Sequence, residues 1–182
     1  MRIGIDIDDT ITNTTSLMDE YAKRYDNTVK INNNEYYMKD RYNWTFQKVE
    51  SFWKQCIEDI LSNVSTKEDA VKYINKLYDE ENDIYLITAR SSRYSVNVPE
   101  ITTNYMDKLG IKYNYLIMNS WDKNRVCLDH NIDIMIDDSP KHASECAEDN
   151  IEFIIMDNEY NKDVDVTRAH NWKEVYEIIN RR

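Results

Sequence analysis

Five short apolar runs alternate with helical patterns along this chain of 182 residues. The apolar runs cover residues 2–7, 84–88, 113–118, 132–136 and 151–156. Continuous apolar runs of this length are typical of strands that are buried on both faces of a parallel sheet. The helical patterns cover residues 12–25, 67–78, 99–109, 123–130, 140–148 and 171–179. The alternation predicts an α/β fold in which about five parallel strands are joined by helical crossovers.

The connection between the first two predicted strands breaks this alternation. Residues 27–65 are rich in Asn, Tyr and Trp and become helical in pattern over 46–57. A connection of this length is far longer than the usual few residues, so we expect a small helical cap rather than a loop. The chain has two Gly and two Pro, which makes a second domain on a flexible tether improbable. We therefore expect a core of residues 1–26 and 66–182 and a cap of residues 27–65.

Charge and cysteine content limit the function classes. The formal net charge of −11 disfavours binding to DNA or RNA polymers, because contact with a phosphate backbone needs a basic face. The three cysteines form no CxxC pair, which favours a reduced, intracellular protein over a zinc protein. No segment approaches the roughly 20 apolar residues of a membrane span, and the amino terminus does not resemble a signal peptide. We expect a soluble, cytoplasmic protein without a membrane partner.

Two carboxylates follow the first apolar run. Asp6 and Asp8 are two residues apart, which sends both side chains to one side of an extended backbone, toward one metal ion or one phosphorus. Carboxylates beside a buried strand are costly unless a cation or donor is near. They could instead cap a helix that begins near Thr12. A calcium loop of the EF-hand type is excluded, because Ile11 replaces its Gly and Leu17 its bidentate Glu.

Three further polar residues lie in positions that suit a phosphate. Thr88 ends the second run, where a hydroxyl and free backbone N–H groups suit a phosphate oxygen, although an ordinary turn residue is equally expected there. Arg90 could clamp the phosphate or pair with an acid. Lys123 would be a surface charge by default. Its position just ahead of the segment that leads to Asp137 makes it a candidate for the site.

A second pair of carboxylates, Asp137 and Asp138, ends the apolar run 132–136. Oxygen ligands without His or Cys favour Mg²⁺ over zinc or copper. Because an acidic protein repels an anionic substrate, a bound divalent cation together with local Lys and Arg side chains must neutralise the site.

These fragments, in this order, resemble the haloacid dehalogenase-like phosphatases. The segment Ile-Asp-Ile-Asp-Asp-Thr-Ile-Thr, residues 5–12, is similar to the first motif of that superfamily. The segments Ile-Thr-Ala-Arg, residues 87–90, and Asp-Asp-Ser-Pro, residues 137–140, resemble more narrowly its deoxyribonucleotidase-like branch, which includes bacterial nucleotidases, and the pair Phe52-Trp53 adds to this likeness. The resemblance implies a Rossmann-like parallel sheet flanked by helices, with a small helical cap inserted after the first strand–helix unit.

The resemblance also implies a mechanism. Asp6 would be the nucleophile that forms an aspartyl phosphate, and Asp8 the general acid and base. Mg²⁺ would be held by the Asp6 carboxylate, the Asp8 backbone carbonyl and Asp137, with Asp138 as a direct or water-mediated ligand. Thr88 and Lys123 would hold the phosphoryl oxygens. The protein would then be a phosphomonoester hydrolase.

The aromatic residues of the predicted cap suggest a substrate. A ring that faces the site can stack on a nucleobase for about 1–3 kcal/mol, and Trp44 or Phe46 is the candidate. We therefore expect a nucleoside monophosphate, although the same rings could form the core of the cap. A sugar phosphate or another small phosphomonoester remains an alternative substrate, and a protein that only binds a nucleotide remains an alternative function. A phosphoacceptor receiver domain is excluded, because its Lys follows all its acids whereas Lys123 precedes Asp137.

Overall fold

Six parallel strands form one sheet in the order β3-β2-β1-β4-β5-β6, in a computed structural model that describes residues 1–181. The strands are β1 (Arg2–Ile5), β2 (Asp83–Ile87), β3 (Tyr115–Ile117), β4 (Ile134–Asp137), β5 (Glu152–Met156) and β6 (Thr167–Ala169). The predicted α/β fold is confirmed, with one strand more than expected. The additional strand, β6, has three residues of which only Ala169 is buried, so it lacks the apolar run that marks the others.

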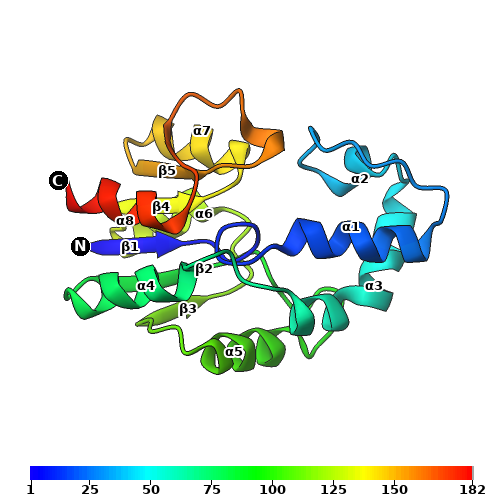
Figure 1. Cartoon of the computed structure of the whole chain (residues 1–182), viewed down its shortest axis with the longest axis horizontal. Helices are drawn as coiled ribbons and strands as arrows, with labels where there is room; N and C mark the ends of the chain where they lie inside the picture. Colours follow the sequence, from blue (N-terminus) through cyan, green and yellow to red (C-terminus); the bar gives the residue numbers. More distant parts are fainter. Residues whose placement is uncertain (182) are drawn as a thin grey trace.

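Helices cover both faces of the sheet (Figure 1). The core contains α4 (Ala70–Asp79), α5 (Val98–Leu109), α6 (Lys123–His130), α7 (Pro140–Glu148), α8 (Trp172–Asn180) and the 3-10 helix η1 (Glu159–Asn161). Side chains alternate along each strand, so Ile3 and Ile5 of β1 pack in one cluster with α4, α5 and α8. Tyr85 and Ile87 of β2 pack in a second cluster with α6 and α7 on the opposite face. The six helices expected from the sequence, 12–25 among them, are all present.

The structure explains why glycine occurs at positions 4 and 110. A Cβ at Gly4 in β1 would approach Met135 Sδ to 2.7 Å and Ile87 Cδ1 to 3.1 Å, so the neighbouring strands leave no room for a side chain. Gly110 has φ of 70° and ends α5, as the sequence predicts for a left-handed residue after a helix. The first glycine allows β1 to pack centrally, and the second turns the chain toward β3.

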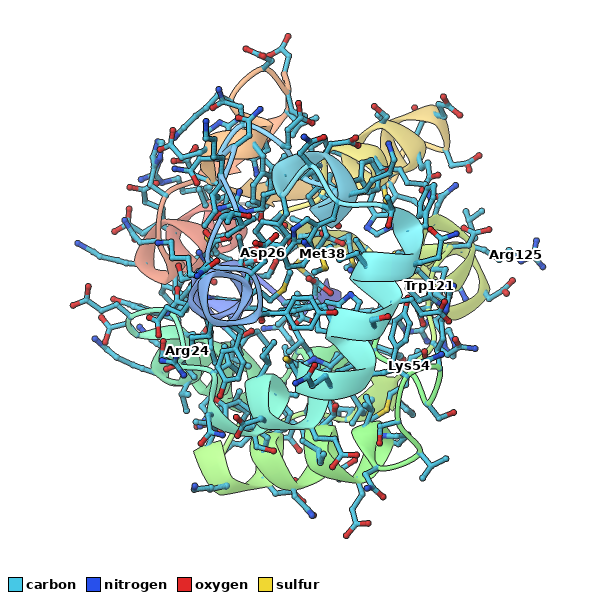
Figure 2. The ribbon with its side chains drawn as sticks, turned by 90° about the vertical axis from the view of Figure 1, so that its right-hand side faces the viewer. Arg24, Asp26, Met38, Lys54, Trp121 and Arg125 are labelled. Carbon is cyan, nitrogen blue, oxygen red and sulfur yellow. The ribbon has the colours of Figure 1, made fainter. Side chains whose placement is uncertain are left out.

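Three helices lie beyond the carboxyl ends of the strands, at the right in Figure 1. They are α1 (Thr14–Tyr25), α2 (Met38–Arg41) and α3 (Phe46–Asn63). Thr45 caps the amino terminus of α3, and its hydroxyl accepts a hydrogen bond from the Lys48 N–H at 3.3 Å. Figure 2 views the molecule from this side, with α1 seen along its axis and α3 in front. This region is the candidate cap.

An apolar cluster joins the proposed cap to α1 and to the core helix α5. Met18 and Ala22 of α1 pack in it with Trp44 and with Phe52 and Ile60 of α3. Residues 27–65 remain our proposed cap. Val98 of α5 belongs to the same cluster, so α1 and α3 pack against the core as well as against each other.

An ion pair joins α1 to the helix α2 of the proposed cap. Arg41 Nη2 lies 2.6 Å from Asp19 Oδ2, and the Tyr42 hydroxyl donates to Asp19 Oδ1 at 2.8 Å. The Arg41 side chain is 6% exposed, so this pair is largely shielded from water. It therefore fixes the short helix α2 against α1.

Across residues 1–181, no helix combines the length and the apolar character that crossing a bilayer requires.

Candidate active site

The polar residues singled out in the sequence converge at the carboxyl edge of three neighbouring strands. Asp6 follows β1, Thr88 follows β2, and Asp137 is the last residue of β4. The sheet order places β1 between β2 and β4, and the chain changes direction across the sheet at β1. A ligand site is expected at such a switch point, because the loops after the strands diverge there. The fold therefore brings together residues that are 49 to 131 positions apart in the sequence.

Lys123 links the first and the last of these fragments. It is the first residue of α6, where the Asp122 side chain accepts a hydrogen bond from the Arg125 N–H at 2.9 Å and caps the helix. Its ammonium lies 2.5 Å from Asp6 Oδ1 and 2.7 Å from Asp137 Oδ2. Burial alone would lower the pKa of Lys123, but Asp137 and Asp6 raise it above its ordinary value. Lys123 is therefore a buried permanent cation rather than a surface charge.

Asp6, Asp137 and Asp138 form a buried cluster of carboxylates. One oxygen from each lies within 4.8 Å of the others. Burial raises the pKa of Asp6 to about 8, against the opposing effect of Lys123. Burial, followed by repulsion from Asp137, raises the pKa of Asp138 well above its ordinary value. A single ammonium cannot balance three acids, and an all-oxygen cluster of this size fits a hard divalent cation.

The two neighbouring acids of this cluster differ in their partners. Asp137 accepts the Ser139 N–H at 2.8 Å on Oδ1, and its Oδ2 contacts both Lys123 and Nδ1 of His142, the latter at 3.0 Å. Asp138 instead is contacted by hydroxyl groups. Its partners are Thr10, 3.3 Å from Oδ1, and Tyr160, 2.6 Å from Oδ2.

Three of these supporting residues were not predicted from the sequence. Thr10 stands inside the first motif, so its hydroxyl could have been suspected. His142 lies in α7 and Tyr160 in η1, and each reaches the acids only through the tertiary fold. No local pattern in the sequence marks either position.

Asp8 stands apart from the buried acid cluster. Its carboxylate is 32% exposed and is held by two groups: the Arg90 guanidinium, whose Nη2 lies 2.7 Å from Oδ1, and the Thr14 hydroxyl, 2.6 Å from the same oxygen. Burial opposes ionisation, but Arg90 outweighs it and lowers the pKa of Asp8. The Asp8 side chain therefore has a different charge environment from Asp6, although the two are two residues apart.

Thr88 and Arg90 lie at the same edge of the sheet. Thr88 is fully buried, and its hydroxyl oxygen accepts the Arg90 N–H at 3.2 Å. Its own N–H donates to Ile117 O at 2.9 Å, which continues the pairing of β2 with β3. The sequence left open whether Arg90 contacts phosphate or an acid. The structure shows that it pairs with Asp8.

The two aromatic residues proposed to contact a base are placed differently. Trp44 is 5% exposed and packs against Tyr25, Tyr42 and Phe52 inside the cap. Phe46 is 73% exposed, with the Lys39 ammonium 5.7 Å from its ring centroid. These contacts are made within the cap and not with the acid cluster. Base stacking by either ring therefore stays a prediction from the sequence.

A polar cavity of about 290 Å³ lies where the proposed cap meets the core. Asp9 and Tyr160 line it from the core, and Asn33 and Arg41 line it from the cap. Asp9 has φ of 56°, an uncommon left-handed conformation for a residue with a side chain, and its carboxylate accepts the Thr15 N–H at 2.9 Å. The acids of the cluster do not line this cavity; Tyr160, whose hydroxyl contacts Asp138, connects the two.

Comparison with known proteins identifies the family. The sequence model of the family described as "5' nucleotidase, deoxy (Pyrimidine), cytosolic type C protein" matches residues 1–182. A nucleotidase of Clostridium acetobutylicum is 26% identical over 186 residues, which cover 100% of this chain and 94% of the relative.

Solved structures show the same fold. The crystal structure of a "predicted phosphatase" from Clostridium acetobutylicum superposes with a TM-score of 0.74 at 12% identity, covering 100% of this chain and 98% of that one. CbbY from Rhodobacter sphaeroides, crystallised with phosphate, gives a TM-score of 0.66 at 10% identity, over 96% and 95% of the two chains. With a family match along its whole length and the acid site described above, the chain belongs to this nucleotidase-like family of haloacid dehalogenase phosphatases and is a phosphoric monoester hydrolase.

Proposed function

We propose that the protein is a Mg²⁺-dependent nucleotidase that works through an aspartyl phosphate on Asp6. The observation that carries this proposal is the contact of Asp6 with Lys123 inside a buried cluster of three carboxylates. Such a cluster is costly to bury, and a site that binds both a cation and a phosphate offsets the cost. In this proposal the Lys123 ammonium, which contacts Asp6, reduces the repulsion between the attacking carboxylate and an anionic phosphate.

The reaction proceeds in two steps in this proposal. An Asp6 oxygen forms a bond to phosphorus, the ester P–O bond breaks, and a protonated Asp8 gives its proton to the leaving alkoxide. Because Arg90 lowers the pKa of Asp8, this protonated form is the minor one in the free site. Asp8 then takes a proton from a water molecule whose oxygen attacks phosphorus, and the bond between Asp6 and phosphorus breaks. Inorganic phosphate leaves and both aspartates return to their starting state. The Lys123 ammonium and the Thr88 hydroxyl hold the phosphoryl oxygens during transfer.

Asp6, the Asp8 backbone carbonyl and the pair Asp137 and Asp138 would hold Mg²⁺. When bound, the ion neutralises charge on the phosphoryl group. We propose Asp138 as the direct ligand of the pair. Both oxygens of Asp137 are already taken by N–H donors and the Lys123 ammonium, whereas hydroxyl partners such as Tyr160 leave Asp138 more freedom to bind a cation.

We propose a nucleoside monophosphate, in particular a pyrimidine deoxynucleoside monophosphate, as the substrate, and the cytosol as the location. The description of the matching family and the nucleotidase from Clostridium acetobutylicum support this choice. The polar cavity between cap and core, lined by Asn33 and Arg41 among others, offers hydrogen-bonding groups for a sugar or a base. Other small phosphomonoesters, such as sugar phosphates, are the competing class.

A substrate series tests the proposal. The purified protein is assayed with Mg²⁺ for phosphate release from pyrimidine and purine deoxynucleoside 5′- and 3′-monophosphates, glucose 6-phosphate and p-nitrophenyl phosphate. We expect kcat/KM to be at least about tenfold higher for a nucleotide than for the sugar phosphate, the size of one stacking or hydrogen-bonding contact. EDTA followed by desalting should abolish activity, and Mg²⁺ should restore it. Equal rates on all esters would leave a generic phosphatase, and binding of nucleotides without turnover would indicate a binding protein.

A further inference from the structure

Arg90 is held in place by its backbone on both sides. Its N–H donates to the Thr88 hydroxyl at 3.2 Å, and its carbonyl accepts the Asn119 N–H at 2.8 Å. The side chain is 3% exposed. An arginine that merely neutralised a surface acid would remain largely in water, so this burial indicates a more specific use.

The guanidinium of Arg90 makes a forked contact with Asp8. Nη2 lies 2.7 Å from Oδ1, and Nε lies 3.0 Å from Oδ2. The Thr14 hydroxyl adds a hydrogen bond of 2.6 Å to Oδ1. Two short hydrogen bonds therefore occupy Oδ1, whereas Oδ2 has one longer partner. Since proton transfer needs a free lone pair, Oδ2 is the oxygen left to exchange a proton with the substrate.

The third nitrogen of the same group is unused. Nη1 of Arg90 is buried and has no hydrogen-bond partner within residues 1–181. An unsatisfied buried donor is unfavourable, and more so on a charged group, so a missing acceptor is the usual explanation. Arg90 lies two residues after Thr88, which follows β2 at the acid site, so the acceptor expected there is an oxygen of a bound phosphomonoester.

We propose that Arg90 is a positioning residue that fixes Asp8 through Nε and Nη2 and receives an oxygen of the bound phosphomonoester on Nη1. The inference rests on the nucleotidase function proposed above and assigns one side chain the task of setting the acid and base group relative to the ester. A planar guanidinium suits this task, because its donors point in fixed directions and can hold two partners in one geometry. Lysine, with one flexible ammonium, cannot reproduce the fork.

The proposal predicts how the loss of kcat/KM in Arg90 variants depends on the leaving group of the ester. Loss of a positioned proton donor slows an ester with a poor leaving group, such as a nucleoside monophosphate, more than p-nitrophenyl phosphate, whose phenolate leaves readily. We expect Arg90→Gln to lower kcat/KM by about 100-fold on the nucleotide and by less than about tenfold on p-nitrophenyl phosphate. Arg90→Lys should show the same difference to a smaller degree.

The test compares four variants with the parent on these two esters. They are Arg90→Gln, Arg90→Lys, Asp8→Asn and the double variant Asp8→Asn with Arg90→Gln. If Arg90 acts through Asp8, the double variant loses on the nucleotide no more beyond Asp8→Asn than Arg90→Gln costs on p-nitrophenyl phosphate. The fork to Asp8 is already useless in that background, so only the phosphate contact on Nη1 remains to be lost. Arg93→Gln serves as a matched control, since Arg93 is exposed in the same loop and lies over the Tyr94 ring.

Equal losses on the two esters, or fully additive losses in the double variant, would overturn the proposal, because Arg90 would then act on the phosphate alone and not through Asp8. If Arg90→Gln does not fold, as judged by thermal melting, Arg90→Lys is held to the same two criteria. A parent protein that releases phosphate from neither ester in the presence of Mg²⁺ refutes the nucleotidase function itself. An active parent with equal losses refutes only the role of Arg90.

Discussion

The acid site and the cap cluster bury side chains for opposite reasons. Asp6, Lys123 and Asp137 are 4%, 3% and 0% exposed, although charges are costly to remove from water. Trp44 and Phe52 of the cap are buried to the same degree, and burial of aromatic surface is favourable in itself. Burial therefore needs a functional explanation at the first site and none at the second.

This difference explains how much each region reveals in the sequence. A charged residue at the end of an apolar run conflicts with folding, so its presence indicates a ligand or a partner. An aromatic residue in a small helical segment agrees with folding, so its presence is compatible with a core, a binding surface or both. The following predictions test whether the two regions differ in this way.

The largest effect should come from the nucleophile. Asp6→Asn should lower kcat by about 10⁴-fold or more, because an amide is a poor nucleophile. Lys123 and the other acids act together with Asp6 in the proposed reaction, so they cannot replace it. Its melting temperature should be equal to or above that of the parent, because one of three mutually repelling buried acids is removed. Phosphate release and thermal melting measure the two quantities. Activity within tenfold of the parent would remove Asp6 from the reaction.

The next effect concerns the two neighbouring acids. Asp138→Ala removes the proposed direct ligand and should weaken Mg²⁺ binding by about 100-fold or more, above the roughly 10–100-fold cost of losing a group that only supports a ligand. Asp137→Ala should chiefly lower kcat, because it releases Lys123. Isothermal titration with Mg²⁺ separates binding from turnover. Stronger loss of binding in Asp137→Ala would reverse the assignment.

Tyr160→Phe sharpens the same comparison. It removes only the hydroxyl that lies 2.6 Å from Asp138 Oδ2 and keeps the ring, which lies 5.3 Å from the Tyr36 ring of the cap. We expect Mg²⁺ affinity to fall by about tenfold, at the lower end of the effects of supporting groups on metal sites. Unchanged affinity in titration would show that Tyr160 does not support the site.

The smallest effects on catalysis should come from the cap aromatics. Trp44→Ala should lower the free energy of unfolding by about 3 kcal/mol or more, because it empties a site packed against Tyr25, Tyr42 and Phe52. Phe46→Ala, at an exposed position, should change it by less than about 0.5 kcal/mol. Denaturant unfolding measures both.

Substrate preference decides whether Trp44 or Phe46 stacks on a base. If Trp44 forms the cap core, the ratio of kcat/KM for a nucleotide to that for p-nitrophenyl phosphate should stay within about threefold of the parent, well below the loss of a stacked base. A loss of kcat/KM on the nucleotide alone in Trp44→Ala or Phe46→Ala would support base stacking. It would also show that the cap aromatics have a function beyond packing, contrary to the difference between the two regions described above.

The sequence predicted the elements whose residues carry strong local signals. Five of the six strands have continuous apolar runs, and β6 was missed because three residues with one buried side chain give no periodicity. The acids were singled out because charges beside buried strands are unusual, and Lys123 because it precedes the segment that leads to Asp137. His142 and Tyr160 could not be predicted, because their contacts with Asp137 and Asp138 exist only once α7 and η1 pack at the sheet edge.

The covalent intermediate on Asp6 gives the most direct test of the central claim, that the buried charges exist for phosphoryl transfer. The enzyme is mixed with a nucleoside monophosphate and Mg²⁺, quenched during turnover and treated with borohydride, which reduces an acyl phosphate to an alcohol. Peptide mass spectrometry should then find homoserine at position 6 in the parent and none in protein quenched without substrate. Full turnover with an unmodified Asp6, or reduction at another carboxylate instead, would contradict the account.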